Sequence, residues 1–141
     1  IVINSFSKSW RMTGWRTGWF TAPPALGETL AKLTEFNTAG PATFAQHAGV
    51  VAIRDGESEV KAQVDRLRVA RDLTFQRLAA HPRLTLSRPK AAFYAFAKVD
   101  GIGVAPGAAF GAAGEGHLRL CFASSPELLT QALDRLETAL D

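Results

Sequence analysis

The first 18 residues constrain the fold of this chain more than any other segment does. A short apolar stretch, Ile1-Val2-Ile3, leads into a turn that is rich in hydroxyl groups and glycine and that carries Lys8 and Arg16. A second apolar run follows at residues 19–22. Apolar runs on either side of a glycine-containing turn are typical of a hairpin. The segment therefore predicts two paired strands whose connection presents a lysine.

The residue types in this turn suit one kind of chemistry. A lysine that forms a Schiff base with an aldehyde cofactor must be partly desolvated, so that its neutral amine is accessible near neutral pH. Arg16 has a fixed charge and a forked geometry, which suits a phosphate better than a second lysine would. The alternative is a solvated loop in which Lys8 has no chemical role.

The small and aromatic residues of the turn have simpler expected roles. Gly14 and Gly18 are expected to let the backbone turn back into the second strand. Trp10, Trp15 and Trp19 are expected to pack around the turn.

The pattern S-x-S-K-x-x-x-M-x-G-x-R-x-G runs through Ser5, Ser7, Lys8, Met12, Gly14, Arg16 and Gly18. It closely resembles the lysine motif of the pyridoxal-phosphate-dependent aminotransferases of fold type I, class I/II. The resemblance implies that Lys8 forms the Schiff base and then moves a proton at the substrate carbon. It also implies that Ser5, Ser7 and Arg16 bind the phosphate of pyridoxal 5'-phosphate.

The same resemblance implies an α/β fold, the C-terminal part of the fold type I aminotransferase fold. Residues 1–56 would end the large cofactor-binding domain, with the end of its sheet and the interface helices. Residues 57–81 would form the long linking helix, and residues 82–141 a small α+β domain.

Arg119 marks a second candidate site because it is the charged residue of an otherwise apolar run, 117–123. A buried or half-buried arginine needs an anion, and a carboxylate offers it two hydrogen bonds. That anion is either a nearby acidic side chain or a ligand. The pattern V-x-P-G-x-x-F-G followed by G-x-x-R also resembles the family. The resemblance implies that Arg119 binds the substrate carboxylate and that Tyr94 lies beside it, with Ala92 where a glycine is usual.

Periodicity predicts the remaining elements. Helices are expected at 25–36, from Pro41 to about Ile53, at 57–80, and from a Ser125 cap to the end, with a loop at 37–41. Strands are expected at 84–86, 92–99, 104–105 and 117–123. By resemblance, Thr38 or Thr43 would reach the cofactor phosphate of the partner subunit in a homodimer; the alternative is that both cap helices.

Composition excludes several classes of function. The chain of 141 residues has 16 Lys+Arg against 13 Asp+Glu and no basic run, which argues against a nucleic-acid surface. No apolar stretch is long enough for a membrane span, and no metal site is expected. Cys121, the single cysteine, is expected to be a small core residue. A cytoplasmic location fits best.

The resemblance implies transamination between an amino acid and a 2-oxo acid. The alternatives are another fold type I activity, such as a carbon–sulfur β-lyase, and the aminotransferase-like effector domain of a transcription regulator. The motifs specify a cofactor and a carboxylate, and they do not specify which bond to the α-carbon breaks.

Parts of the family's machinery have no counterpart in this sequence. The acid that pairs with the pyridine nitrogen, the aromatic that stacks on the ring and the asparagine near the ring hydroxyl all precede the lysine motif. A helix between the strands at 93–96 and 104–107 is also absent, so we expect missing residues at the Gly101-Ile102 junction. We therefore expect the C-terminal portion of a longer protein, inactive by itself.

Overall fold

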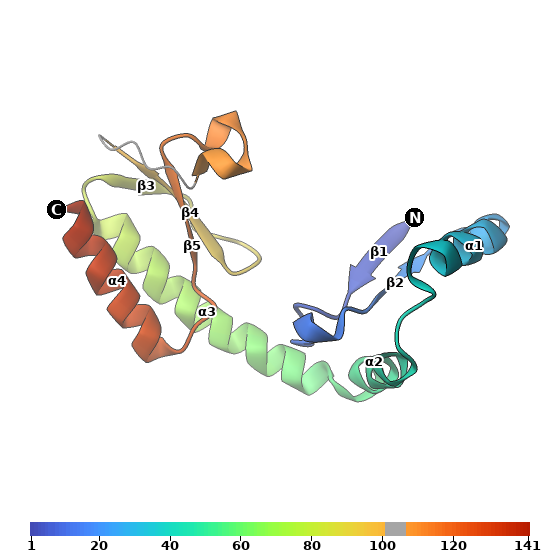
Figure 1. Cartoon of the computed structure of the whole chain (residues 1–141). Helices are drawn as coiled ribbons and strands as arrows, with labels where there is room; N and C mark the ends of the chain where they lie inside the picture. Colours follow the sequence, from blue (N-terminus) through green and yellow to red (C-terminus); the bar gives the residue numbers. More distant parts are fainter. Residues whose placement is uncertain (101–106) are drawn as a thin grey trace. The chain divides into compact units, whose positions relative to one another are not determined.

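The computed structural model describes residues 1–100 and 107–141 (Figure 1). The Gly101-Ile102 junction and the strand expected at 104–105 lie outside the described residues. The chain divides into two compact units, Ile1–Gln63 and Val64–Asp141, and each is described by itself. In the described part of the chain, no helix is long and apolar enough to cross a membrane.

The predicted hairpin opens the first unit. Strand β1 (Val2–Ser5) pairs antiparallel with β2 (Gly18–Thr21), and Ser5 lies opposite Gly18. A Cβ atom at Gly18 would overlap the carbonyl oxygen of Asn4. Gly18 is therefore required because the two strands approach closely, which is a different reason from the one the sequence suggested.

In the turn between these strands, the residues with a left-handed backbone conformation are not the expected ones. Arg11 and Arg16 have positive φ angles of 57° and 51°, whereas Gly14 and Gly18 do not have positive φ. The prediction that the two glycines reverse the chain is therefore wrong. The chain reverses through the two arginines and a short 3-10 helix, Thr13–Trp15, which costs more than glycine would because a side chain crowds the left-handed region.

Two helices follow the hairpin. A 3-10 turn at Pro24–Leu26 leads into α1 (Gly27–Thr38), and α2 spans Thr43–Asp55. The loop expected at 37–41 begins two residues later, because α1 continues until Ala39 takes a left-handed conformation and its N–H bonds the carbonyl of Glu35.

Aromatic side chains form the centre of the first unit. The ring of Phe6 lies 5.3 Å from that of Trp10 and 4.7 Å from that of Trp19. Phe6 is 5% exposed, and Gly49 of α2 is buried against its ring. The expectation that the tryptophans pack around the turn is confirmed for Trp10 and Trp19. Trp15 is 46% exposed, with its ring 6.0 Å from that of Phe44.

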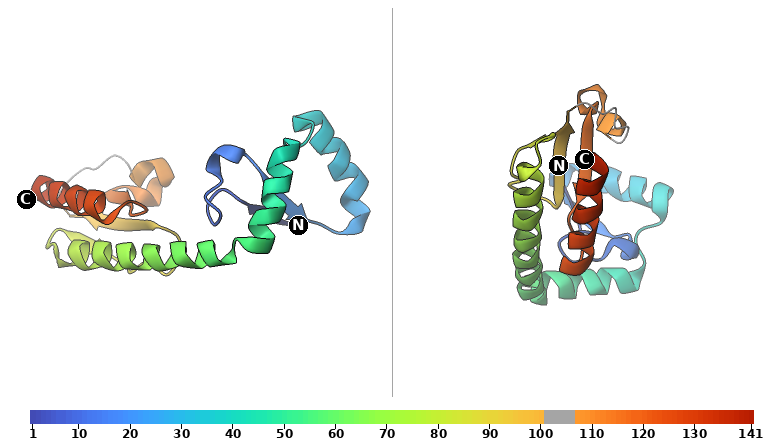
Figure 2. Two further views of the ribbon diagram at one scale, coloured as in Figure 1. Left: turned by 90° about the horizontal axis from the view of Figure 1, so that it is seen from below. Right: turned by 90° about the vertical axis from the view of Figure 1, so that its left-hand side faces the viewer.

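The second unit combines three strands and two helices. Helix α3 (Glu57–Ala80) begins in the first unit and supplies most of its length to the second. Strands β3 (Leu84–Leu86), β4 (Tyr94–Val99) and β5 (His117–Cys121) form an antiparallel sheet in that order, and α4 (Pro126–Leu140) ends the chain. In both views of Figure 2, α3 and α4 lie along the same face of this sheet.

Alternation along the strands separates a buried face from an open one. Ala95, Ala97 and Val99 of β4 face a core that includes Leu78 of α3 and Leu133 of α4. The alternate residues of β4 and β5 lie on the open face.

Cys121 belongs to this open face, where it is exposed. The expectation of a core cysteine is therefore wrong. The apolar run at 117–123 is a strand with one buried side, and its period of two places Cys121 with Arg119 on the other side.

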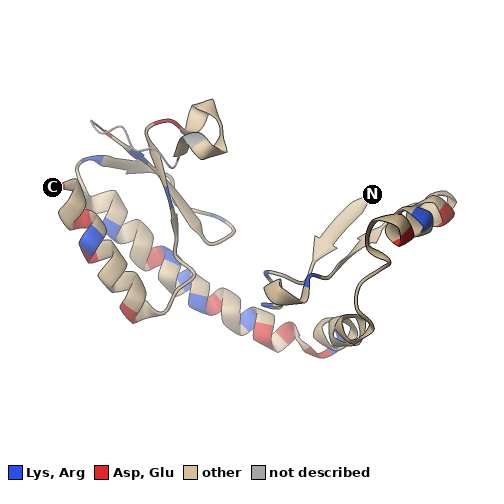
Figure 3. Ribbon diagram, viewed as in Figure 1, with Lys and Arg blue, Asp and Glu red and all other residues tan. Residues whose placement is uncertain are grey.

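Helix α3 has the bounds that the sequence predicted, and charges of both signs follow one another along it (Figure 3). Its buried residues are Thr74 and Leu78, whereas Val64 is 40% exposed. The helix ends before His81 and Pro82.

Candidate active site

Lys8 lies three residues beyond β1, in the turn that leads toward β2. Its main-chain carbonyl accepts two hydrogen bonds, from the N–H of Arg11 at 3.3 Å and from Nε2 of Gln63 at 3.2 Å. Phe6 and Met12 are buried on either side of it in the sequence. The backbone at Lys8 is therefore held by both local and distant contacts. The residue itself is exposed, so the partial desolvation expected of a Schiff-base lysine is not found among the described residues of this chain.

The expected phosphate ligands are linked to one another by hydrogen bonds. Ser5 Oγ lies 2.9 Å from Ser7 Oγ and accepts the N–H of Ser7 at 3.1 Å. Thr13 donates its hydroxyl to the carbonyl of Ser7 at 2.9 Å, and Arg16 donates to the carbonyl of Thr13 at 3.1 Å. Ser5, Ser7 and Arg16 thus belong to one continuous network, in which Thr13 is a member that the sequence did not single out.

This network presents an anion-binding set of donors. Ser5, Thr13 and Arg16 are exposed, and Ser7 is half-buried. Two hydroxyl groups and a guanidinium are the donors that proteins use for phosphate groups. The geometry of the turn is therefore compatible with a bound phosphate beside Lys8.

Trp10 ties the lysine turn to helix α2. Its indole Nε1 donates to the carbonyl of Ala52 at 2.8 Å, near the end of that helix. A Cβ atom at Gly56 would overlap the carbonyl oxygen of Ala52 and would lie 3.0 Å from the Trp10 ring. Glycine at position 56 therefore leaves room for both partners of this hydrogen bond, a function that the sequence could not show.

Arg119 lies on the open face of the sheet in the second unit. Its guanidinium carbon lies 4.5 Å from the centre of the Tyr94 ring and 3.9 Å from that of Phe110. The side chain is exposed, so the expectation that it is buried or half-buried is wrong. β5 alternates, and Arg119 falls on the side opposite the core.

The contacts of Arg119 bear on the two anions expected for it. Among the described residues, no acidic side chain forms an ion pair with Arg119. Aromatic rings attract and orient a cation but do not neutralise its charge. A ligand anion therefore stays a prediction for Arg119.

Further aromatic residues extend this site. Phe96 stacks on His117 at 4.9 Å with an angle of 10° between the rings, and it meets Phe110 edge to face at 6.4 Å. The sequence did not single out Phe96 or His117. The sequence signal that could have indicated them is that both residues alternate with more buried neighbours in β4 and β5.

The two threonines near α2 differ in their contacts. Thr38 accepts the N–H of Gly40 at 3.2 Å and donates to the carbonyl of Thr34 at 3.3 Å, so it closes the end of α1. Thr43 is the first residue of α2, whose N-terminus has no side-chain cap. Capping therefore accounts for Thr38 and does not account for Thr43.

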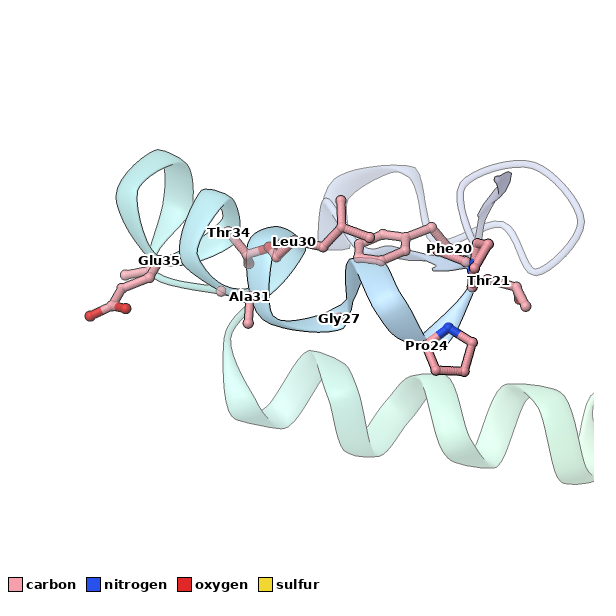
Figure 4. A pocket seen from close by; sticks show the side chains of 12 residues that line it. Phe20, Thr21, Pro24, Gly27, Leu30, Ala31, Thr34 and Glu35 are labelled. Atoms are coloured by element: carbon pink, nitrogen blue, oxygen red, sulfur yellow. The ribbon is translucent and has the colours of Figure 1, made fainter.

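A hollow of the first unit lies apart from these predicted residues. It is lined by the end of β2 and by α1, including Phe20, Pro24, Leu30 and Thr34 (Figure 4). Its lining is mainly apolar, with Glu35 as the charged member.

Comparison with known proteins points to one family. The family model described as aminotransferase class I and II matches residues 1–136. The chain therefore belongs to the aminotransferase class I and II family.

Individual relatives narrow the comparison. The chain is 36% identical over 160 aligned positions to an aspartate aminotransferase of Pyrococcus horikoshii, covering 100% of this chain and 41% of the relative. It is 35% identical to an aromatic-amino-acid aminotransferase of Thermococcus litoralis, covering 99% of this chain and 41% of that protein. The first alignment exceeds the 141 residues of this chain by 19 positions, so that relative carries at least 19 residues without a counterpart here.

Solved structures show the same fold. An aromatic aminotransferase of Pyrococcus horikoshii matches with a TM-score of 0.89 at 33% identity, over 98% of this chain and 42% of that one. An aspartate aminotransferase of Rhizobium meliloti matches with a TM-score of 0.89 at 29% identity, over 99% and 41%. The α/β aminotransferase fold is thus shown, and the chain spans about two fifths of the length of these relatives.

Proposed function

We propose that the protein containing this chain transfers an amino group between an amino acid and a 2-oxo acid, with pyridoxal 5'-phosphate as cofactor. The observation that carries the proposal is the network through Ser5, Ser7, Thr13 and Arg16 around the backbone of Lys8. Family membership supports it, as do the relatives described as aspartate and aromatic aminotransferases.

The residues of the turn fit this cofactor. Ser5, Ser7 and Arg16 would hold its phosphate, because their hydroxyl and guanidinium donors already belong to one hydrogen-bonded network. When bound, the cofactor supplies the electron sink that stabilises negative charge on the substrate carbon.

Lys8 would contribute its amine in two ways. Its Nζ would hold the cofactor covalently as a Schiff base between turnovers. When its nitrogen is free, Lys8 would also move a proton at the substrate α-carbon.

Arg119 would orient the substrate. Its guanidinium would bind the α-carboxylate through two parallel hydrogen bonds, and the rings of Tyr94 and Phe110 would restrict its rotation. An arginine that is already oriented loses less entropy when the carboxylate binds.

The arrangement of the whole protein follows from the same family. We propose that residues 1–56 end a large cofactor-binding domain, that 57–81 form the linking helix, and that 82–141 form the small C-terminal domain. We also propose a cytoplasmic homodimer, in which Thr43, whose side chain caps no helix, is the better candidate than Thr38 for the cofactor phosphate of the partner.

The test combines labelling with a substrate screen on the full-length protein. Borohydride reduction of the cofactor-loaded protein followed by peptide mapping should place the label on Lys8. Amino-group transfer from aspartate or an aromatic amino acid to a 2-oxo acid should then be measurable. A label on another lysine overturns the assignment of Lys8, and elimination of a thiol without amino transfer favours a carbon–sulfur lyase instead.

A further inference from the structure

We propose that Gln63 is a positioning residue for Lys8. Its side-chain amide holds the main-chain carbonyl of Lys8 and thereby sets the point from which the lysine side chain extends. The inference rests on the proposed role of Lys8 as the cofactor lysine. Gln63 lies 55 residues further along the chain, on α3, and no part of the lysine motif includes it.

The four residues from Lys8 to Arg11 contribute little to holding their own part of the lysine turn. The carbonyl of Lys8 accepts the N–H of Arg11 at 3.3 Å, which closes a four-residue turn. Arg11 has a φ of 57°, a conformation that is unfavourable for a residue with a long side chain. Both residues are exposed, so burial contributes little here. A turn of this kind depends on contacts from outside it.

Gln63 supplies one of these contacts from a regular helix. Lys8 and Gln63 belong to the same compact unit, and Nε2 lies 3.2 Å from the Lys8 carbonyl oxygen. The nitrogen of the amide must face this oxygen, because two acceptors facing each other would repel. The backbone of α3 is held by its own hydrogen bonds, so the donor is fixed in position.

The side-chain oxygen of Gln63 indicates that glutamine does not stand at this position to stabilise its own surroundings. Oε1 of Gln63 is buried and has no hydrogen-bond partner among the described residues. A buried acceptor without a partner is destabilising, and an apolar side chain of similar length would avoid that cost. Glutamine at position 63 is therefore explained by what its nitrogen holds, the backbone of Lys8.

A second contact keeps the turn folded when Gln63 is changed. The Trp10 indole donates to the carbonyl of Ala52 at 2.8 Å and packs among aromatic rings. This contact does not involve Gln63. Substitutions at Gln63 should therefore move Lys8 without unfolding the unit.

The experiment compares Gln63→Met and Gln63→Glu with Gln76→Met in the full-length protein. Gln76 is exposed on the same helix, so it controls for losing an amide from α3. Gln63→Met should raise the dissociation constant of pyridoxal 5'-phosphate about three- to tenfold, or about 0.7–1.4 kcal/mol. Its denaturant midpoint should match that of the wild type.

Gln63→Glu adds a readout that a packing role would not change. A carboxylate near Lys8 favours the protonated form of the lysine nitrogen, so the pH at which the bound cofactor changes colour should rise. Gln63→Met should produce a smaller change, and Gln76→Met none.

The possible failures are distinguishable. Both Gln63 variants could bind the cofactor as tightly as the wild type and change colour at the same pH, with Lys8 still labelled by borohydride. That result would overturn this inference and leave the proposed function intact. A midpoint of unfolding that falls in parallel with affinity would also overturn it, because Gln63 would then be structural. A wild-type protein in which borohydride does not label Lys8 overturns the proposed function and this inference with it.

Discussion

The two compact units of the chain hold their site residues by different means. In the second unit, Phe122 and Leu133 are completely buried beneath the sheet that carries Arg119. In the first unit, the turn that carries Lys8 is held by a hydrogen-bond network and by the buried side chains of Phe6 and Met12. One unit positions its cation above a packed core, and the other positions its lysine largely through a polar network beside a small aromatic cluster.

The difference has a physical consequence. A strand over a core resists displacement because packing is dense and its loss is costly. A polar turn moves when a single donor is lost, because each hydrogen bond contributes about 1 kcal/mol. For substitutions in the second unit, the effect on stability and the effect on activity should therefore be easier to measure separately than for substitutions in the first unit.

The largest expected effect on activity tests whether Arg119 acts on substrate and not on cofactor. Arg119→Ala leaves a substrate carboxylate without the charge-assisted hydrogen bonds of this exposed arginine, which costs about 1.5–3 kcal/mol. At about 1.4 kcal/mol per tenfold, kcat/KM should fall between about 10-fold and 150-fold. The variant should remain yellow with bound cofactor, because Lys8 and its network lie in the other unit. Loss of cofactor together with activity would show that Arg119 is structural.

Leu133→Ala tests the core of the second unit. Leu133 is 0% exposed, so removing its side chain should lower the free energy of unfolding by about 2–5 kcal/mol. Leu128→Ala on the same helix is the control, because Leu128 is 59% exposed and should change stability by less than about 0.5 kcal/mol. Denaturant unfolding measures both, and equal losses would show that the two positions do not differ in packing.

Ala92→Gly tests strain in the loop before β4. Ala92 has a φ of 61°, in the left-handed region. Relief of that strain is offset in part by the greater freedom of glycine in the unfolded chain, so stability should rise by about 0.5–1 kcal/mol. Ala132→Gly in α4 is the control. It should lower stability by about 1 kcal/mol, because Ala132 lies in a helix, where glycine is unfavourable. Equal signs for the two variants would contradict the assigned strain.

The smallest expected effect concerns the pKa of Asp72 and its contribution to stability at low pH. Hydrogen bonds from Arg71 and then Arg88 lower the pKa of Asp72 to about 2. A lowered pKa stabilises the fold above the unfolded value of about 3.9, and this contribution is lost as the pH falls through about 2. Asp72 is exposed, so the measurement is its titration by NMR.

Arg88→Gln should move the titration midpoint of Asp72 upward, with Arg71 still lowering it. A midpoint near 4 in the wild type would show that these ion pairs do not persist in solution.

Much of the fold could be predicted because it follows from local patterns. Three elements appear as expected: the helix at 57–80, the cap and proline that begin α4, and the hairpin around Lys8. Each depends on periodicity or capping within a few turns of chain. The exposure of Cys121 and Arg119 could not be predicted from hydropathy, because both fall in an apolar run of which one side is open.

The candidate site divides in the same way. Ser5, Ser7, Lys8 and Arg16 follow from a motif, since their spacing is local and their chemistry is demanding. The place of Phe110 beside Arg119 and of Gln63 beside Lys8 depends on contacts between distant segments. Phe110 belongs to a motif that does not record its contact with Arg119, and Gln63 belongs to no motif.

The amino-acid sequence by itself determined most of the elements and singled out the candidate residues for the chemistry, because motifs, caps and periodicity act over short stretches of chain. The tertiary structure alone decided how those residues are held. It shows that arginines and not glycines have the left-handed conformations of the lysine turn. It also shows that aromatic rings contact Arg119 and that an amide on α3 bonds the backbone of Lys8. The last two contacts join segments far apart in the chain, where no local spacing records which atoms will meet.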